Sequence, residues 1–232
     1  MKRYLPFLII GAVLAGVAII VIVLTRTSNS TTSHSTTSQP NSNAYFNYTP
    51  PPGALPAHAI GPENAAVTLE EFGDYQCPPC GIMFPEVKKI EAEYGDKIRF
   101  IFRQNPLPQI HKYAITAAHA AEAAGMQGRF WAMHDKLYEN QKVWEKADDP
   151  RATFIEYARS IGIDVDRFTK DLSSEEADNR LVEDHKRAAA LGVTGTPTFF
   201  VNGRELKGNA TTGVTADVIR SALNSALQSA QK

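Results

Sequence analysis

The sequence predicts an α/β domain preceded by one N-terminal transmembrane helix and a polar linker. Three features of the 232 residues predict this organisation. Residues 5–24 contain no charged side chain. Strand-like alternation over residues 67–73 is followed by helical spacing over residues 81–94. A second strand, residues 97–104, is separated from a C-terminal hairpin by a long stretch of helical character, residues 110–191. Strands that alternate with helices in this way are typical of a sheet covered by helices.

The apolar run from Leu5 to Leu24 has the length of a membrane-spanning helix. Its 20 residues would extend about 30 Å, which is the thickness of the hydrocarbon core of a bilayer. A cleaved signal peptide is the alternative, but its apolar region is usually about 7–15 residues long and ends in a small-residue cleavage site, which residues 25–27 do not provide. Lys2 and Arg3 precede the run and only Arg26 follows it closely. This bias predicts a cytoplasmic N-terminus and an extracytoplasmic domain.

Residues 25–60 are expected to form a linker between the membrane and the domain. Ser, Thr and Asn dominate residues 25–42, and three consecutive prolines, residues 50–52, stiffen the later part. The low hydrophobicity argues against a packed fold in this stretch. The sequence therefore predicts an anchor over residues 1–24, this linker, and a folded domain over residues 61–232.

Charge and length exclude some classes of function. The whole chain has a net charge of −1, and because residues 1–60 contain three basic and no acidic side chains, the rest has a net charge of −4. The absence of a basic stripe in the sequence argues against nucleic-acid binding. About 170 residues are enough for a single domain with its own core. The sequence contains no metal, nucleotide or flavin motif.

Cys77 and Cys80 are the only cysteines of the chain, and they stand in a Cys-Pro-Pro-Cys motif between a strand and a helix. Cys77 is therefore expected near the helix N-terminus, where backbone N–H groups and the helix dipole favour a thiolate, the species that attacks disulfides. Pro78 and Pro79 fall in the first turn, where proline is tolerated. Because they donate no N–H group, Cys80 and later residues must stabilise the sulfur. We expect Cys77 to be exposed and acidic and Cys80 to be shielded.

Two other interpretations of the cysteine pair were considered. A zinc site needs two further ligands, and the chain has no second cysteine pair. The nearby histidines, His111, His119 and His134, show no paired ligand spacing, and histidines on such helices are mostly structural. An inert structural disulfide is the second alternative. The motif favours a catalytic redox pair over both.

The segment from Glu71 to Cys80, EFGDYQCPPC, resembles the active-site segment of DsbA-like thiol–disulfide oxidoreductases, which have a thioredoxin fold. Pro85 stands where the active-site helix of this fold carries a kinking proline, and the segment from Gln127 to Asp135 resembles part of the helical insert of this group. The resemblance covers about residues 60–230. It implies a thioredoxin fold with an inserted helical domain at about residues 110–191.

The resemblance also implies a substrate-binding loop. The segment from Gly195 to Thr198, GTPT, is similar to the cis-proline loop of the fold, which would place Thr196 and Pro197 beside Cys77. The Thr196 backbone is then expected to pair with an extended client segment in the manner of an added strand. Immediately after this strand, Asn202-Gly203 predicts a two-residue hairpin turn.

Glu71 is the third candidate catalytic residue. It alternates with Val67 and Leu69, so that a central strand covered on both faces would bury it. The alternative is that Glu70 and Glu71 are exposed acids at a strand edge. Thioredoxin-fold enzymes carry a buried acid at this offset from the first cysteine, and the resemblance implies that Glu71 exchanges protons with Cys80.

The predicted function is that of an extracytoplasmic thiol–disulfide oxidoreductase that introduces disulfides into secreted or membrane proteins. The redox-active Cys77–Cys80 disulfide would be its only cofactor. Its partners would be cysteine-containing client proteins, a separate protein that recycles the redox pair, and the membrane, through the N-terminal helix. A disulfide reductase or isomerase of the same fold is the first alternative, because the direction depends on the stability of the reduced form. The second is a tethered binding module that uses the Pro197 groove without turnover.

Overall fold

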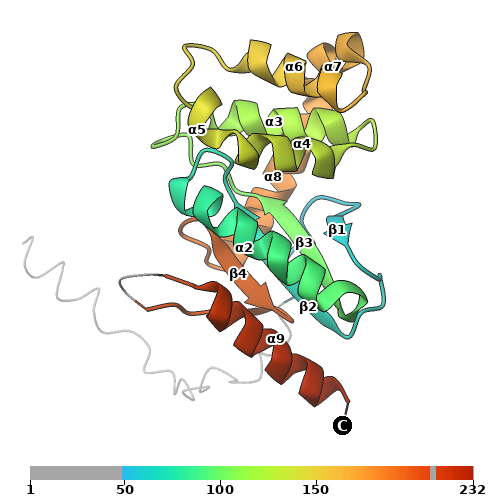
Figure 1. The fold of residues 1–232 in the computed structure, drawn as a ribbon, viewed down its shortest axis with the longest axis vertical. Coiled ribbons are helices and arrows are strands. Elements are labelled where there is room, and N and C mark those ends of the chain that lie inside the picture. Colours follow the sequence, from blue (N-terminus) through green and yellow to red (C-terminus); the bar gives the residue numbers. More distant parts are fainter. Residues whose placement is uncertain (1–48, 210–212, 232) are drawn as a thin grey trace, which may run out of the picture. The chain divides into compact units, whose positions relative to one another are not determined.

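In the computed structural model, which describes residues 49–209 and 213–231, a five-stranded mixed sheet lies at the centre of the domain (Figure 1). The strand order is β1-β3-β2-β4-β5. The central strands β2 and β3 are parallel, and every other neighbouring pair is antiparallel. The strands are β1 (His58–Ile60), β2 (Val67–Gly73), β3 (Ile98–Gln104), β4 (Thr198–Val201) and β5 (Arg204–Glu205).

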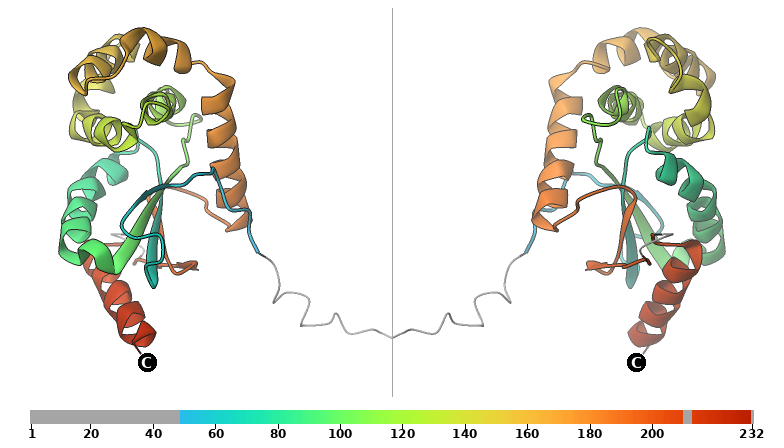
Figure 2. Two further views of the ribbon diagram at one scale, coloured as in Figure 1. Left: turned by 90° about the vertical axis from the view of Figure 1, so that its right-hand side faces the viewer. Right: turned by 90° about the vertical axis from the view of Figure 1, so that its left-hand side faces the viewer.

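Helices cover both faces of the sheet and the end at which β2 finishes. Two helices, α2 and α9, pack on each other along one face, and α8 covers the other face (Figure 2). The remaining α-helices, α3 to α7, form a separate layer beyond the carboxyl end of β2 (Figure 1). The helices are α2 (Pro78–Tyr94), α3 (Ala114–Gly125), α4 (Phe130–Glu139), α5 (Gln141–Trp144), α6 (Arg151–Ser160), α7 (Val165–Asp171), α8 (Glu175–Ala190) and α9 (Ala216–Ala230), with a 3₁₀ turn, η2 (Gly95–Lys97), after α2.

The predicted order of strands and helices is confirmed. The first core strand has the expected bounds, Val67–Gly73, and the expected helical stretch contains α3 to α8. The turn between β4 and β5 has Asn202 at φ 48° and Gly203 at φ 74°, as a hairpin turn with two positive φ angles requires. The helix α3 buries seven alanines, so that its backbone can approach α4 closely: Ala114, Ala117, Ala118, Ala120, Ala121, Ala123 and Ala124 are each at most 1% exposed.

The folded unit begins earlier than residue 61, where the sequence analysis placed its start. It extends from Thr49, and β1 pairs with β3 inside the expected linker. Ala54 is only 2% exposed, and its N–H and carbonyl groups bond to Asp184 and Arg103. A strand of three residues is too short to show the alternation of polar and apolar side chains that identifies a strand. The sequence therefore shows no sign of β1.

A buried ion network fixes this N-terminal segment to the face of the sheet that α8 covers. The Glu70 carboxylate lies 2.8 Å from Arg103 Nε and 2.8 Å from Arg187 Nη2. Arg103 also lies 3.0 Å from Asp184 in α8. The same two arginines donate to backbone carbonyls of residues 51–54. The Glu70 carboxylate is thus fully paired where a buried charge would otherwise be costly.

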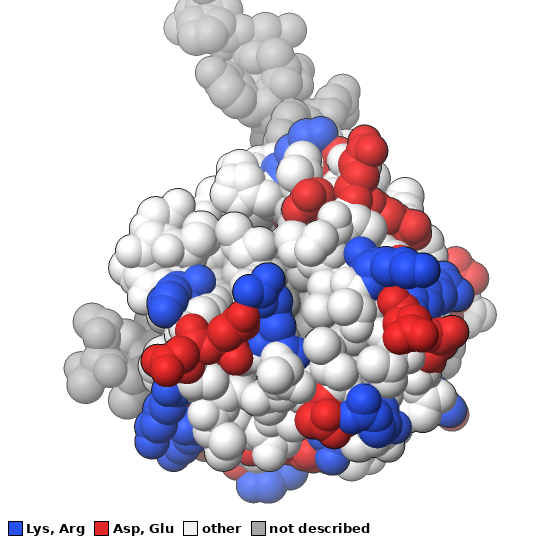
Figure 3. Space-filling view, turned by 90° about the horizontal axis from the view of Figure 1, so that it is seen from above, with Lys and Arg blue, Asp and Glu red and all other residues white. Residues whose placement is uncertain are grey.

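The predicted membrane span, Leu5 to Leu24, lies outside the described residues. Within the described part of the chain, no helix has both the length and the apolar character needed to cross a membrane. The outer face of the helical layer carries both acidic and basic side chains, and among the described residues they form no continuous stripe of one sign (Figure 3).

Candidate active site

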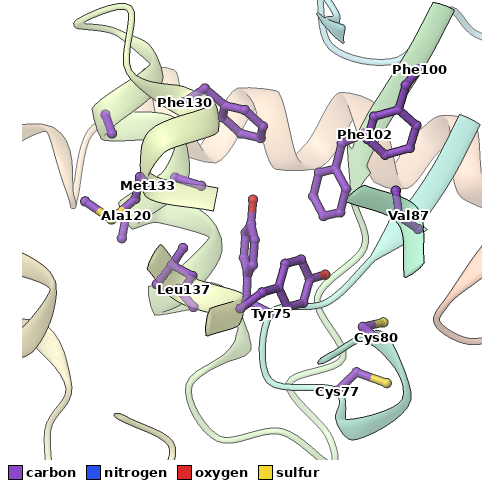
Figure 4. Close-up of a cluster of buried hydrophobic side chains, with 14 of the residues drawn as sticks. Tyr75, Cys77, Cys80, Val87, Phe100, Phe102, Ala120, Phe130, Met133 and Leu137 are labelled. Carbon is purple, nitrogen blue, oxygen red and sulfur yellow. The ribbon is translucent and has the colours of Figure 1, made fainter. Parts of the chain in front are cut away.

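The two cysteines lie at the N-terminus of α2, directly after the turn that follows β2. Cys77 is the N-cap residue, and Pro78 and Pro79 occupy the first turn, as the sequence predicts. Both cysteines are free thiols in this structure. Their side chains project on the same side of the helix terminus, next to the aromatic cluster around Tyr75 (Figure 4). Two sulfurs in this arrangement at a helix N-terminus are suited to forming a disulfide with each other.

The expectation that Cys77 is exposed is wrong, because both cysteines are buried. Cys77 is 4% exposed and Cys80 is 0% exposed. Cys77 is buried because the loop before β4 lies against its thiol. Cys77 Sγ donates a hydrogen bond to the Thr196 carbonyl over 3.2 Å. Only a narrow part of Cys77 is therefore open to another molecule, while Cys80 is enclosed.

The surroundings of the two sulfurs separate their acidities. The pKa of Cys77 is lowered to about 6, mainly by a hydrogen bond with the Cys80 thiol. Burial opposes this effect, and hydrogen bonding with Thr196 and with the Cys80 backbone adds to it. The Thr196 hydroxyl is buried and has no hydrogen-bond partner among the described residues, so it is free to turn toward the Cys77 sulfur. Burial, followed by the neighbouring Cys77, raises the pKa of Cys80 well above its usual range. Cys77 thus loses its proton well before Cys80, and the hydrogen bond that it donates to the Thr196 carbonyl belongs to its protonated form.

The loop that contains Thr196 and Pro197 has the predicted arrangement. The Thr196–Pro197 peptide bond is cis, and β4 begins at the next residue and pairs with β2. The hydrogen bond from Cys77 to the Thr196 carbonyl joins this loop to the helix terminus. A segment of backbone therefore stands beside the more acidic sulfur, where an extended peptide can pair with it.

Glu71 lies in the central strand β2, between Phe102 of β3 and Phe199 of β4. It is 3% exposed, so the alternative of an exposed edge acid is wrong. Burial is the main reason that the pKa of Glu71 rises to about 8, with further contributions from Glu91 and Cys77. No ion pair to Glu71 is found in the described part of the chain. Near neutral pH this carboxyl can both hold and release a proton.

Asp74, which the sequence analysis did not single out, holds the turn before Cys77. It is 1% exposed, and its backbone carbonyl accepts from the Cys77 N–H group over 3.1 Å. Its carboxylate accepts from the N–H groups of Gln76 and Leu107 over 2.8 and 2.9 Å. His111 Nδ1 lies 2.7 Å from the same carboxylate. Asp74 lies inside the segment that carries the family resemblance, and the short polar side chain three residues before Cys77 was the available signal.

Gln141 of α5 supports the same turn from the helical layer. Its Nε2 group donates to the carbonyls of Tyr75 and Cys77 over 2.7 and 2.9 Å. Gly81 leaves the room that this side chain needs, since a Cβ atom there would lie 2.3 Å from Gln141 Oε1. The sequence offers no signal for this role, because the partners are backbone groups more than 60 residues away.

The other two histidines have structural surroundings. His119 pairs with Asp178 at 2.9 Å, and His134 lies in an aromatic cluster with Tyr75, 5.6 Å between ring centroids. Burial lowers the pKa of His134, which keeps its imidazole neutral. Among the described residues, no three His, Cys, Asp or Glu side chains are grouped so that they can hold a metal ion.

Solved structures of similar fold carry the same architecture. BdbD from Bacillus subtilis, in its oxidised form, is 27% identical with a TM-score of 0.62, and the match covers 74% of this chain and 93% of that chain. A thioredoxin-like oxidoreductase from Silicibacter pomeroyi DSS-3 is 25% identical with a TM-score of 0.62, and the match covers 81% of this chain and 98% of that chain. The fold and the paired cysteines define the class of thioredoxin-fold thiol–disulfide oxidoreductases.

The family profile described as Thioredoxin matches residues 54–220, and the chain belongs to this family. A curated relative, the Na(+)/H(+) antiporter NhaA 1 of Salinispora arenicola, is 43% identical over 152 residues. That match covers 66% of this chain and 22% of the antiporter. The chain thus spans about a fifth of the length of that relative, and the antiporter's name is not transferred to it.

Proposed function

We propose that the protein is an extracytoplasmic thiol–disulfide oxidoreductase that introduces disulfides into client proteins. The observation that carries the proposal is the asymmetry of the cysteine pair. Cys77 has a pKa of about 6 and lies beside the Thr196 backbone, whereas Cys80 is enclosed and has a raised pKa. A stabilised Cys77 thiolate favours the reduced state of the pair, and such a pair tends to oxidise its clients.

The reaction balances with one external oxidant. A client thiolate attacks Cys77 Sγ of the Cys77–Cys80 disulfide, a client–Cys77 mixed disulfide forms, and Cys80 leaves as a thiolate. Cys80 then takes a proton, and Glu71 is the buried acid that supplies it. A second client thiolate attacks the client sulfur of the mixed disulfide, and Cys77 leaves as a thiolate. The client has lost two electrons to the pair, which a disulfide-bearing recycling partner must reoxidise.

Client binding is assigned to the Thr196–Pro197 loop. An extended client segment would pair with the Thr196 backbone, which holds the client cysteine against Cys77 Sγ. The burial of Cys77 supports this assignment, because a client has to approach along the loop to reach a sulfur that is only 4% exposed. The clients are proteins with unpaired cysteines in an oxidising compartment.

The reduction potential of the full chain tests the direction. A value near about −120 mV against glutathione supports a disulfide-introducing enzyme, and a value near about −270 mV supports a reductase. Cys77→Ser separates turnover from binding: an oxidoreductase loses all activity, whereas a tethered binding module keeps its affinity for clients. An isomerase would instead reshuffle a wrongly paired client without a net change in its thiol count.

The proposed location follows from the apolar run Leu5 to Leu24, which we take to be a retained anchor with Cys77 outside the cell membrane. Fractionation of the native protein tests this proposal. Recovery of the full chain with membranes, together with reaction of Cys77 with an impermeant thiol reagent on intact cells, is the expected result. A soluble chain that begins near Ser28 would indicate a cleaved signal peptide instead.

A further inference from the structure

The turn before Cys77 is fastened to the segment that leads into the helical layer. Three hydrogen bonds join them: Leu107 N–H and His111 Nδ1 to the Asp74 carboxylate, at 2.9 and 2.7 Å, and Tyr113 N–H to Gln76 Oε1, at 2.6 Å. Two of the three end on the Asp74 carboxylate. His111 is the one side chain that bonds to this carboxylate among the described residues, since the other donors are backbone N–H groups.

The Asp74 side chain is fully buried, and that of His111 is 14% exposed. An ionised carboxylate can only accept hydrogen bonds, so His111 donates from Nδ1. The negative charge of Asp74 acts against a second negative charge on Cys77, and it is among the influences that raise the pKa of that thiol. The hydrogen bond that His111 donates offsets part of this charge and holds the Asp74 side chain in place.

We propose that His111 is a positioning residue of the redox site, which sets the reactivity of Cys77 through the buried Asp74 carboxylate. The proposal rests on the proposed function in one respect, that Cys77 is the attacking sulfur. Beyond the proposed function, the His111 contact gives the segment between β3 and α3 an influence on the redox pair. Glu71, the other carboxyl that acts on Cys80, is unchanged in the variants below.

Substitution of His111 in the full chain tests the proposal. His111→Phe keeps a ring of similar size but cannot donate, so we expect the Cys77 pKa to rise by about half a unit or more. The equilibrium with glutathione should then shift by about threefold toward the Cys77–Cys80 disulfide. His111→Gln keeps a donor, and its Cys77 pKa should lie close to that of the wild type. The pKa is read from thiolate absorbance during a pH titration of the reduced protein.

A second histidine–aspartate pair provides the matched control. His119→Phe disrupts the His119–Asp178 pair, which joins α3 to α8 and, among the described residues, has no hydrogen bond to the turn before Cys77. It should leave the Cys77 pKa unchanged. A His111 that served the fold alone would behave in the same way: His111→Phe would lower the melting temperature without moving the Cys77 pKa, and this result would overturn the proposal.

Asp74→Asn keeps the proposal testable if His111→Phe does not fold. Removing the charge should lower the Cys77 pKa below the wild-type value, and an unchanged pKa would contradict the proposal. In the Asp74→Asn background, the His111→Phe change should have less than half its effect in the wild type. Because these measurements read one thiol and not turnover, they stay informative even if the protein proves to be a reductase. If Cys80 were the reactive cysteine, alkylation would reveal it separately from the His111 effect.

Discussion

Glu70 and Glu71 are adjacent in β2 and are both buried, yet their carboxylates face opposite sides of the sheet and opposite chemical surroundings. Glu70 is paired with Arg103 and Arg187, each at 2.8 Å. Glu71 lies among apolar neighbours on the side of α2, and burial raises its pKa to about 8. One acid is therefore held in an ion network with two arginines, and the other is a group that can gain or lose its proton near neutral pH.

The Glu70 network predicts a large loss of stability when one partner is removed. Arg103→Met should lower the free energy of unfolding by about 3–5 kcal/mol, because Glu70 and Asp184 keep buried charges without their shared cation. Urea denaturation measures the loss. Arg159→Met removes an exposed ion pair with Glu156 and should have a much smaller effect. Equal effects of the two substitutions would contradict the role of the network.

The same substitution should release the N-terminal segment of the domain. Arg103 donates to the carbonyls of Pro52 and Ala54, which are more than 45 residues away in the chain. Without these bonds the segment before β1 loses contacts that hold it to the sheet. Limited proteolysis of the Arg103→Met variant should cut near residues 51–56 faster than in the wild type, under conditions in which the rest of the domain stays folded. Unchanged cutting would show that β1 alone fixes the segment.

Gln141 is predicted to stabilise the turn that carries Cys77. Gln141→Leu leaves the buried Tyr75 carbonyl without its side-chain donor and removes one of the two donors to the Cys77 carbonyl, and the free energy of unfolding should fall by about 2 kcal/mol. Gln127→Leu is the control, because Gln127 bonds to backbone groups at an exposed site and its loss should cost less than half as much. Thermal melting of both variants measures the two losses of stability. Similar melting temperatures would argue against a special role for Gln141.

The sequence predicted those parts of the molecule that local patterns encode. Alternation located Glu71 in a buried strand, and the motif Cys77-Pro78-Pro79-Cys80 located the helix N-terminus. Alternation could not tell that Glu70 is buried too, because its partners Arg103 and Arg187 lie 33 and 117 residues away. Long-range pairing of this kind leaves no local period.

The support of the active-site turn shows the same limit. Asp74 and Gln141 each bond to two backbone groups, and a backbone group carries no residue type that a sequence pattern could record. The exposure of Cys77 was mispredicted for a related reason. A Cys-x-x-Cys motif fixes the position of the sulfur on the helix, but the loop at Thr196 that covers it is 119 residues away.

The acidity of Cys77 is predicted to depend mainly on Cys80. Alkylation of the reduced protein across a pH series should modify Cys77 first, with a midpoint near 6. Cys80→Ala removes the thiol that contributes most to this low value, so the midpoint should rise by about one unit or more. Thr196→Val removes the weaker hydroxyl donor and should raise it less. Preferential labelling of Cys80, or a midpoint near 9 in the wild type, would contradict the assignment of the two sulfurs.

The stability of the domain is predicted to depend on the proton of Glu71. A carboxyl whose pKa is raised from 4.5 to about 8 in the folded state stabilises the fold fully below about pH 4.5 and loses this contribution as the pH rises through about 8. Glu71→Gln has no such proton. Its free energy of unfolding should therefore gain on the wild type between pH 5 and pH 8, by at most about 1.4 kcal/mol per pH unit. Urea denaturation at several pH values measures the difference, and a difference independent of pH would show that Glu71 keeps an ordinary pKa.

The same variant tests the proton transfer. Glu71→Gln should slow thiol–disulfide exchange about tenfold or more at the step in which Cys80 leaves and takes its proton, while the later step, in which Cys77 leaves, keeps its rate. Glu70→Gln is the matched control: it changes the neighbouring acid on the other face of β2, so it should lower stability without changing either step. Stopped-flow exchange with a model peptide resolves the two steps. Exchange by Glu71→Gln at the wild-type rate from pH 5 to pH 8 would exclude the relay, because a buried neutral amide can neither supply nor accept the proton that Cys80 requires.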